Sequence, residues 1–317
     1  MREIDFWPLS LINFAFGMGI SMKSSIVFLM LLALAFCPFS GAWARSLAEI
    51  RQTGEIRIGI SPIHPSICRA EPQGCRTDCR ITGPAYDIAL AFAETLGPNV
   101  RPRFLRIDWD EQFFNPAGKT IRDDAYTPEL LASGQVDLYP NNLSINEWRR
   151  KKMDIVTLFP SRRMVVVNRS RKEAIRGASD LAGKVAAVEK DTSYHTWLQE
   201  QNQGAFALKP VMIRLMNTDE CLKTVDKGDA DFTMVDSDAA IWAVRQEYRN
   251  LDMAFPVGTT DENGWGLRKQ DKDLQDEVRR FFREQRADEQ SALNRIWQKY
   301  YGMSLTQFIR LVGAIME

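Results

Sequence analysis

The sequence predicts an α/β fold divided into two domains, and three observations support this prediction. Short runs of β-forming residues alternate with amphipathic helical runs along most of the chain, which is typical of parallel sheets with crossover helices. The chain has 317 residues, of which 45% are hydrophobic and 26% charged, an ordinary composition for a folded globular protein. Because one domain usually takes roughly 150 residues, this length favours about two domains with separate cores.

The expected strands are short apolar runs, bounded by polar or turn-forming residues. In chain order they are Glu55–Ser61, Arg101–Ile107, Val136–Tyr139, Met164–Asn168, Lys184–Val188, Val211–Leu215 and Asp231–Val235. Strands that alternate with helices in this way belong to parallel sheets, so the predicted class is α/β.

The helices are expected between and after these strands. Ala85–Leu96 carries apolar residues on one face and stops before a glycine, and Asp219–Lys227 begins with a capping residue and also ends at a glycine. Asp273–Tyr301 is predicted to form two amphipathic helices. The last segment, Leu305–Met316, has an apolar face that we expect to pack on the body of the protein, because it lacks the cationic face of a membrane-surface helix.

The first 44 residues are predicted to be a cleavable signal peptide that directs the protein to the periplasm. Met22-Lys23 provides a positive start, Ile26–Phe36 a short apolar core, and Ala42-Trp43-Ala44 a cleavage sequence of the A-x-A type. The apolar core is too short to span a bilayer as a helix. Residues 1–21 precede a second possible start and reflect either an early start codon or an extended n-region.

Charge and histidine content argue against two classes of function. The chain contains 41 Lys and Arg against 41 Asp and Glu, which gives a formal net charge of +0. A dedicated nucleic-acid-binding protein is basic, so we expect no nucleic-acid partner. His64 and His195 are the two histidines of the chain, so we expect no histidine-rich metal site, and nothing in the sequence points to another cofactor.

Four cysteines remain after the predicted cleavage: Cys68, Cys75, Cys79 and Cys221. An even number of cysteines in an oxidising compartment predicts disulfides. Three of them lie in one loop, so we expect a local bridge, either Cys68–Cys75 or Cys68–Cys79, with the remaining pair joining this loop to Cys221. The spacing does not choose among the connectivities, and one local bridge with two free thiols stays open.

A set of motifs occurs in one order along the chain. They are Gly54–Ile60, Gly83–Ala89, Leu130–Leu138, Leu143–Arg149, Met153–Ile155, Asp180–Val188, Asp191–Tyr194, Gly228–Asp236, Gly264–Lys269 and Ile296–Gly302. Each motif is weak alone, but in this order they resemble the bacterial extracellular solute-binding proteins of family 3, the polar amino acid receptors of ABC importers. The resemblance covers about Ser46 to Gly302.

The resemblance implies a two-lobed periplasmic binding protein of type 2 with two crossover hinge strands. Lobe 1 would comprise residues 45–161 and 257–317, and lobe 2 residues 162–256, with crossings near Phe159–Arg163 and Phe255–Asp261. The implied function is capture of an amino acid or similar small zwitterion between the lobes, for delivery to an ABC permease in the inner membrane. By the same resemblance we expect a monomer that is not an enzyme.

In the family, an arginine at the position of Arg149 binds the carboxylate of the ligand. A planar guanidinium suits this role because it offers two parallel donors to two oxygens. The resemblance places the Ser144 hydroxyl on the same carboxylate and backbone groups of Asn142 nearby. A surface arginine is the alternative, because three basic residues follow; we expect Arg150, Lys151 and Lys152 to form a solvated face.

The motif Asp191–Tyr194 lies between a strand and a helix, where free backbone N–H groups bind anions. Thr192 and Ser193 are therefore predicted to bind the ligand, although a simple helix N-cap explains them as well. Many relatives carry glycine at Asp191 or Ser193, which puts close approach of the backbone to the ligand in doubt; Asp191 would in addition repel an anion.

Asp236 follows the expected strand Asp231–Val235, and ligands of open α/β sheets bind beyond the carboxyl ends of strands. The resemblance implies that it binds the α-ammonium group of the ligand. The alternative is an N-cap for Ser237–Arg245, and we expect Asp238 to serve only as a cap.

Further residues are expected in the cleft. Trp109 is expected either as an aromatic shelf for the ligand side chain or as a core residue. Ser61 lies in the first cleft loop, where we expect His64 to be solvated. Insertions at Cys68–Cys79 and Gln112–Ala125 would reshape the pocket, so the identity of the ligand is not implied.

Two other functions remain open. One is a ligand-sensing accessory of a signalling or redox system. The other is a lyase similar to the periplasmic cyclohexadienyl dehydratases, which need a buried acid facing the substrate. The sequence shows no nucleophile–base pair, no set of metal ligands and no such acid.

Overall fold

The structure is a computed structural model that describes residues 45–76 and 78–314. The predicted signal peptide and its cleavage site, and Ile315 and Met316 of the last predicted helix, lie outside the described residues. Within the described ranges, no helix combines the length and the apolar character that a bilayer crossing requires.

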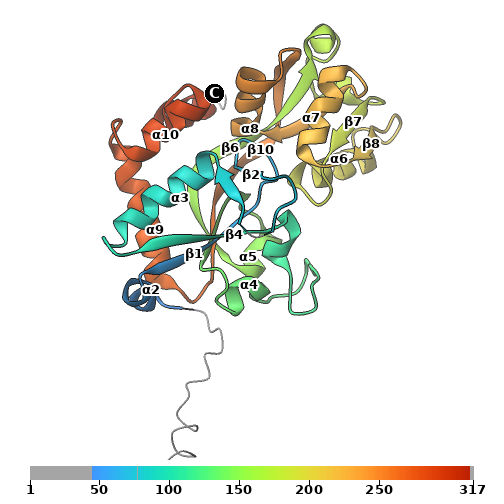
Figure 1. The fold of residues 1–317 in the computed structure, drawn as a ribbon. Helices are drawn as coiled ribbons and strands as arrows, with labels where there is room; N and C mark the ends of the chain where they lie inside the picture. The colour runs from blue at the N-terminus through green and yellow to red at the C-terminus, as the bar shows by residue number, and fades with distance from the viewer. Residues whose placement is uncertain (1–44, 77, 315–317) are drawn as a thin grey trace, which may run out of the picture. The chain divides into compact units, whose positions relative to one another are not determined.

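An eight-stranded sheet organises the described residues, in the order β4-β1-β5-β10-β6-β9-β7-β8 (Figure 1). Its strands are β1 (Glu55–Ile60), β4 (Arg101–Arg106), β5 (Leu138–Ser144), β6 (Asp154–Asn168), β7 (Val185–Val188), β8 (Met212–Leu215), β9 (Phe232–Asp236) and β10 (Leu251–Leu267). The outer strands pair in parallel, as the alternation of strands and helices predicted: β1 with β4 and β5, and β7 with β8 and β9. A separate hairpin joins β2 (Arg69–Glu71) to β3 (Arg80–Thr82).

Helices connect and cover these strands. The α-helices are α2 (Leu47–Thr53), α3 (Pro84–Thr95), α4 (Glu129–Ala132), α5 (Glu147–Lys152), α6 (Ser193–Gln203), α7 (Thr218–Lys227), α8 (Ser237–Trp242), α9 (Lys272–Ala287), α10 (Ala292–Tyr301) and α11 (Leu305–Ala314). The 3₁₀ helices are η1 (Trp109–Phe113), η2 (Arg169–Ala174) and η3 (Ala178–Leu181), and η4 (Ala243–Glu247) is a π-helical turn.

The long strands β6 and β10 connect the two halves of the sheet (Figure 1). We call the side with β4, β1 and β5 the first half, and the side with β9, β7 and β8 the second half. β10 pairs antiparallel with β6 from Leu251 opposite Asn168 to Leu267 opposite Asp154. The two expected crossings lie opposite each other in this ladder, and the lobe boundaries stay a prediction.

Two expected strands differ from the structure. Met164–Asn168 was expected, and β6 instead begins at Asp154. A second strand is shifted along the chain. Val136–Tyr139 was expected, and β5 instead covers Leu138–Ser144. The reason is a turn after α4: Gly134 takes a left-handed conformation, with φ of 70°, and the Val136 N–H donates to the carbonyl of Leu130. Val136 therefore closes the turn and does not begin the strand.

Gly264 in β10 belongs to the motif Gly264–Lys269, and the fold needs a glycine at this position. A Cβ atom at Gly264 would lie 2.1 Å from the carbonyl oxygen of Val156 in β6. The pairing of β10 with β6 shifts register between Asn263 and Gly264. A side chain here would push apart the two strands that connect the halves of the sheet.

The first half of the sheet is covered on both faces. On one face, Ile56 and Ile58 of β1 pack with Phe92 of α3 and Phe282 of α9. On the other face, Tyr139 of β5 belongs to a cluster with residues of η1 and of the segment that holds α5. This arrangement follows from the alternation of side chains in a strand, because neighbouring residues point to opposite faces.

The second half is covered in the same way. Val188 of β7 packs with Trp197 and Leu198 of α6, whereas Ala187 faces the cluster that contains Leu222 and Val225 of α7. Burial of these apolar side chains holds α6 in place, and the beginning of α6 forms part of the site described below.

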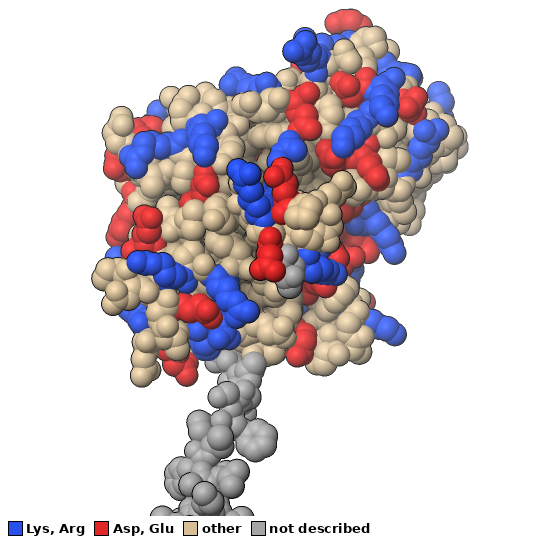
Figure 2. All heavy atoms as spheres, viewed as in Figure 1, with Lys and Arg blue, Asp and Glu red and all other residues tan. Residues whose placement is uncertain are grey.

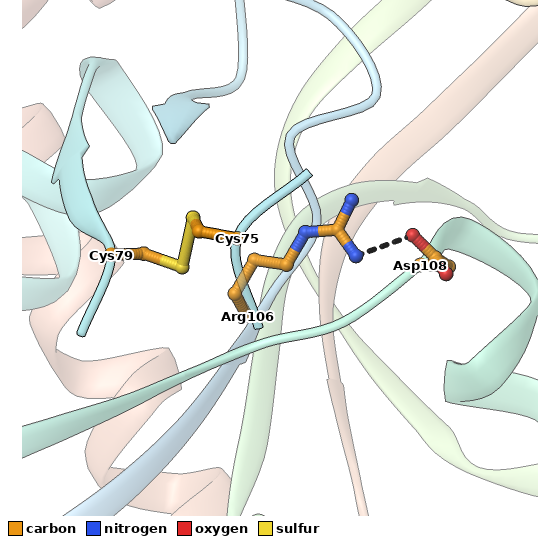
Figure 3. Close-up of a disulfide and its surroundings, with 4 residues drawn as sticks. All are labelled: Cys75, Cys79, Arg106 and Asp108. Atoms are coloured by element: carbon orange, nitrogen blue, oxygen red, sulfur yellow. Dashed lines mark ion pairs between the residues drawn. A yellow bond between two sulfur atoms is a disulfide. The ribbon is translucent and has the colours of Figure 1, made fainter. Parts of the chain in front are cut away.

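The cysteine loop contains one disulfide, Cys75–Cys79, which lies beside the ion pair of Arg106 and Asp108 (Figure 3). The expected bridges through Cys68 are therefore wrong. Cys68 packs in an apolar cluster with Ile60, Ile67 and Ile81, and Cys221 is buried in the main core. Both are free thiols, and burial raises the pKa of each to about 12.

Basic and acidic side chains are interspersed over the face of the molecule in Figure 2. This pattern agrees with the balanced charge of the sequence. The face shown in Figure 2 has no extended basic surface of the kind that binds nucleic acid.

Candidate functional site

A cavity of about 50 Å³ lies where the two halves of the sheet meet. A buried water needs at least about 10–15 Å³ of such space, so the cavity has room for several waters or for the charged end of a small ligand. Its lining comes from the loop after β1, from η1, β5 and α5 of the first half, and from α6, α7, β9 and α8. The polar residues of this lining are His64, Ser66, Trp109, Asn141, Asn142, Ser144, Arg149, Thr192, Ser193, Tyr194, Thr218, Asp236 and Asp238.

Most of the predicted ligand-binding residues come together in this cavity. Trp109, Asn142, Ser144, Arg149, Thr192, Ser193 and Asp236 all line it. Ser61 does not, and lies instead in a wider adjoining pocket, where its backbone N–H donates to Asn141 Oδ1 at 3.0 Å. The two pockets share Ile63 and Trp109, so we call the wider one the mouth of the cavity.

Arg149 is buried, with 3% of its surface exposed, so the alternative of a surface arginine does not hold. Asn146 caps α5 and accepts a hydrogen bond from the Arg149 N–H, which places the side chain beside the end of β5. One guanidinium nitrogen donates to the carbonyl of Ser144 at 2.9 Å, and Nε has no partner. Within the described residues, no carboxylate lies at ion-pair distance from Arg149.

Three aromatic rings surround this guanidinium. Its central carbon lies 5.7 Å from the ring centre of Trp109, 5.4 Å from Phe113 and 5.2 Å from Trp148. Aromatic faces attract a cation without neutralising it. Burial lowers the pKa of Arg149 to about 10, which still leaves it charged at neutral pH. The site therefore holds a desolvated cation that lacks an anion.

The expectation that Lys152 is solvated is wrong. Its ammonium group donates to the carbonyl groups of Ile121, Arg122 and Asp124, and the residue is fully buried. Lys152 thereby ties the predicted insertion Gln112–Ala125 to α5. Arg150 and Lys151 are exposed, as expected.

Asp236 ends β9, with 9% of its surface exposed. Asn263 of β10 donates to Oδ2 at 2.8 Å, whereas Oδ1 has no partner. Although Asp236 occupies the N-cap position of α8, its side chain makes no capping hydrogen bond. Burial and the charge of Asp261 raise the pKa of Asp236 above its ordinary value, and hydrogen bonds from Asn263 and Tyr194 and the charge of Arg149 oppose this shift.

Asp238 does not act as a simple cap, which corrects the expectation for this residue. Only 3% of its surface is exposed. Asn142 donates to Oδ2 at 3.2 Å, and Oδ1 has no partner. Asn142 has φ of 49°, a left-handed conformation that asparagine tolerates better than most residues. Burial raises the pKa of Asp238, and the charge of Asp236 raises it further.

The ligand-free site destabilises the fold when Asp238 ionises, because its pKa in the folded state lies above the unfolded value. This cost is absent below the unfolded pKa and develops as the pH rises through the folded pKa. We expect Asp238→Asn to raise the melting temperature Tm of the ligand-free protein at about pH 8, by roughly 2–4 °C per kcal/mol gained. The gain should shrink as the pH falls toward about 4. Scanning calorimetry of the wild type, Asp238→Asn and the control Asp229→Asn, which changes an exposed carboxylate, measures Tm at each pH. A Tm of Asp238→Asn below that of the wild type at about pH 8 contradicts the prediction.

The beginning of α6 is compatible with both interpretations of its motif, a helix N-cap and a site for an anion. Thr192 is the N-cap: its hydroxyl accepts from the His195 N–H at 3.3 Å and donates to the carbonyl of Glu189 at 2.7 Å. Ser193 and Tyr194 are the first two residues of the helix and line the cavity, and the first N–H groups of an α-helix have no intrahelical partner. The start of this 11-residue helix therefore offers donors to an anion.

Asp191, expected to repel an anion, does not line the cavity. It takes the left-handed conformation with φ of 63°, and its carboxylate pairs with Arg122 at 3.0 Å. Since Arg122 belongs to the predicted insertion Gln112–Ala125, this insertion reaches from the first half of the sheet to the second.

Two cavity residues were misjudged or given no role from the sequence. His64 was expected to be solvated, but 3% of its surface is exposed, and its ring packs at 5.2 Å against Trp242. Burial lowers the pKa of His64 to about 3, so the ring is neutral, and Nε2 has no partner. Tyr194 is partly buried, and desolvation together with the nearby charge of Asp236 raises its pKa well above the ordinary value. Among the described residues, no group of His, Cys, Asp and Glu side chains has the arrangement of a metal site.

Residues 56–303 match the family described as bacterial extracellular solute-binding proteins, family 3. This protein belongs to that family. The match covers the sheet, the cavity and α10, so the predicted resemblance is confirmed.

Two relatives illustrate the range of this solute-binding family. The L-cystine-binding protein TcyJ of Escherichia coli (strain K12) is 24% identical over 263 residues, which cover 82% of this chain and 88% of that protein. A membrane-bound lytic murein transglycosylase F of Desulfosudis oleivorans is 27% identical over 259 residues, or 81% of this chain but 51% of that protein. The chain thus spans about half the length of the transglycosylases that it matches, which have a different domain arrangement.

Solved structures confirm the fold class. The ancestral amino acid-binding protein AncCDT-1, a precursor of cyclohexadienyl dehydratase, superposes with a TM-score of 0.64 at 22% identity and covers 80% of this chain and 99% of that one. A substrate-binding protein of an ABC uptake transporter from Streptococcus pneumoniae, with bound histidine, gives a TM-score of 0.63 at 19% identity, with 81% and 96% covered. The solute-binding protein described here therefore has the two-lobed α/β fold of type 2 periplasmic binding proteins.

Proposed function

We propose that this protein captures an amino acid, or a similar small zwitterion, in the cavity and delivers it to an ABC importer. The observation that carries the proposal is a pair of opposite charges, each with one buried atom that has no hydrogen-bond partner. Arg149 Nε and Asp236 Oδ1 are both buried without a hydrogen bond and belong to residues lining the same cavity. Buried polar atoms are almost always hydrogen-bonded, so a ligand that offers an acceptor to Arg149 and a donor to Asp236 would satisfy both atoms.

A zwitterion supplies both kinds of group. Its carboxylate accepts from Arg149, with the Ser144 hydroxyl and the N–H groups at the start of α6 as further donors. Its ammonium group donates to Asp236 Oδ1. The backbone of Asn142 lies beside this region on β5, and Trp109 forms a wall of the cavity.

Binding of this kind also favours closure. Arg149 follows β5 in the first half of the sheet, and Asp236 ends β9 in the second. A ligand that contacts both binds the closed arrangement more tightly than an open one, and so shifts the population toward it. Closure around the ligand is the signal that a permease partner would recognise.

The relatives support an amino acid as ligand without naming which one. Their names and titles mention L-cystine, histidine and arginine, each for that protein. The cysteine loop and the segment 112–125 differ from the pattern of the resemblance, so we carry over the class of ligand and not its identity. The same proposal places the protein in the periplasm, exported by residues 1–44, as a monomer that meets an inner-membrane permease.

A direct test is a fluorescence screen against the amino acids. Trp109 lines the cavity and Trp148 packs on Arg149, so ligand binding should change tryptophan emission in a saturable way. Native mass spectrometry of gently purified protein should show the same compound retained. The variant Arg149→Ala serves as the control and should lose the response at the same concentrations. A flat response to every amino acid, with no retained zwitterion, contradicts the proposal.

One observation favours a second function, a dehydratase of the cyclohexadienyl type. Asp238 is a buried carboxyl group at the cavity with a raised pKa, so it can hold a proton for a leaving hydroxyl. An enzyme of this type would eliminate carbon dioxide and water from prephenate or arogenate, with the proton of Asp238 leaving in the water, to give phenylpyruvate or phenylalanine, and Asp238→Asn would abolish turnover. We expect wild-type protein to bind amino acids and to leave both compounds unchanged, and turnover would favour the enzyme instead.

A further inference from the structure

The charges that line the cavity do not balance. Arg149 contributes one positive charge, whereas Asp236 and Asp238 are two carboxylates. His64 is neutral, because burial lowers its pKa to about 3. The nearby half-buried pair of Arg163 and Asp261, at 2.9 and 3.1 Å, is neutral in itself. Arg149 therefore balances the charge of one of the two carboxylates, and the charge of the other has no counterpart in the cavity.

Asp238 is the carboxylate without a compensating cation. Its Oδ2 accepts from the neutral amide of Asn142, and its Oδ1 is buried with no donor. The neighbouring Tyr301 hydroxyl donates to the carbonyl of Ser66 and not to Asp238. No Lys or Arg lies at ion-pair distance from Asp238 in the part of the chain that the structure describes. A positive group of a ligand, or a proton, would supply the partner that Oδ1 lacks.

We infer that the cavity selects ligands with a net positive charge, in which Asp236 and Asp238 together hold two positive groups. This inference rests on the proposed function. A neutral zwitterion satisfies Arg149 and Asp236 and leaves Asp238 protonated or uncompensated. A ligand with a second positive group neutralises the site and favours the ionised form of Asp238.

The mouth of the cavity supports the same preference. Glu71, Asp110 and Glu189 line it without an ion-pair partner among the described residues, and Lys190 is the opposing unpaired cation. The excess of negative charge attracts a cationic ligand during approach. It also faces the part of a longer side chain that extends beyond the small inner cavity.

Pairs of amino acids that match in size and differ by one charge test this inference. L-arginine is compared with L-citrulline, and L-2,4-diaminobutyrate with L-homoserine, by titration calorimetry at neutral pH. In at least one pair, the Kd of the cationic member for the wild-type protein should be about tenfold lower, or lower still, than the Kd of the neutral member. This is the effect expected of a hydrogen bond to a charged group. The short pair covers the case in which arginine is too long for the cavity.

The variant Asp238→Asn tests the residue itself. It keeps the shape of the side chain and removes the charge. We expect the ratio between the cationic and the neutral member to fall to within about threefold, mainly because the cationic ligand binds more weakly. Asp229→Asn removes one exposed carboxylate outside the cavity and should leave the ratio unchanged. Because Asp238→Asn is expected to stabilise the ligand-free fold, its binding can be measured.

The outcomes separate this inference from the proposed function. If wild-type protein binds neutral amino acids as tightly as cationic ones, or if Asp238→Asn leaves the ratio unchanged, the preference for positive charge is overturned and the receptor function stands. If the wild-type protein binds no amino acid at all, the proposed function fails, and this inference fails with it.

Discussion

Replacing Arg149 with alanine weakens binding of the amino acid ligand by roughly thirtyfold to several thousandfold, because truncating one partner of a desolvated charge pair costs about 2–5 kcal/mol and each 1.4 kcal/mol is about tenfold. The ligand carboxylate loses the guanidinium that meets it inside the cavity, where water does not replace the lost donors. Titration calorimetry with the ligand identified in the amino acid screen measures the change in Kd.

Two further variants make this result specific. Arg150→Ala removes the same type of side chain one residue along α5, where it is exposed, and should leave Kd unchanged. Arg149→Lys keeps the charge but loses the planar pair of donors, so it should bind with intermediate affinity. A loss below about threefold for Arg149→Ala would show that the guanidinium does not bind the ligand.

Asp236→Asn is expected to weaken binding by roughly thirtyfold or more, for the same physical reason at the ammonium end of the ligand. The amide keeps the volume of the side chain but no longer offers a charged acceptor to the ligand. The variant also removes a buried carboxylate whose pKa is raised, so the ligand-free protein should not become less stable at neutral pH.

A double-variant cycle distinguishes a ligand that bridges the two residues from one that contacts only one of them. The combined loss in Arg149→Ala with Asp236→Asn should be smaller than the sum of the single losses in binding free energy, because either change disrupts the same bridge. Asp229→Asn is the matched control for the loss of one carboxylate. Additive losses, or an Asp236→Asn protein with wild-type affinity, would contradict the role of this residue.

The site explains why the protein tolerates local features that reduce stability. Arg149, Asp236 and Asp238 are buried without full pairing, and the left-handed conformation of Asn142 accompanies its hydrogen bond to Asp238. Each feature is unfavourable in the ligand-free protein, and a charged ligand would supply the partners that the three buried side chains lack. Departures from local consistency of this kind are typical of functional sites.

Most of the fold could be predicted from local sequence, and β10 is the main exception. Its sequence contains Pro256 and Gly258 and mixes polar with apolar residues, so it lacks the alternation that indicates a strand. It becomes a strand because it pairs along its length with β6 and, near its end, with β5. Pairing between distant segments is a tertiary effect, which propensity alone does not report.

The order of the motifs predicted which residues come together at the cavity. It did not predict which side chains are buried. Arg149 and Asp236 reach the cavity as the resemblance implied. Asp238, His64 and Lys152 were misjudged because their burial depends on packing by segments far away in sequence. The pairing of Cys75 with Cys79 in place of Cys68 has the same origin, since Cys68 is drawn into an apolar cluster with strand residues.

The central claim is that Arg149 and Asp236 bind the two charged groups of one zwitterion from opposite halves of the sheet. A crystal structure of the protein with its retained ligand tests it most directly. The account predicts the carboxylate of the ligand on the Arg149 guanidinium and its ammonium on Asp236 Oδ1, each within about 2.7–2.9 Å. A bound ligand whose charged groups contact other residues, with either of these side chains turned to bulk solvent, contradicts it.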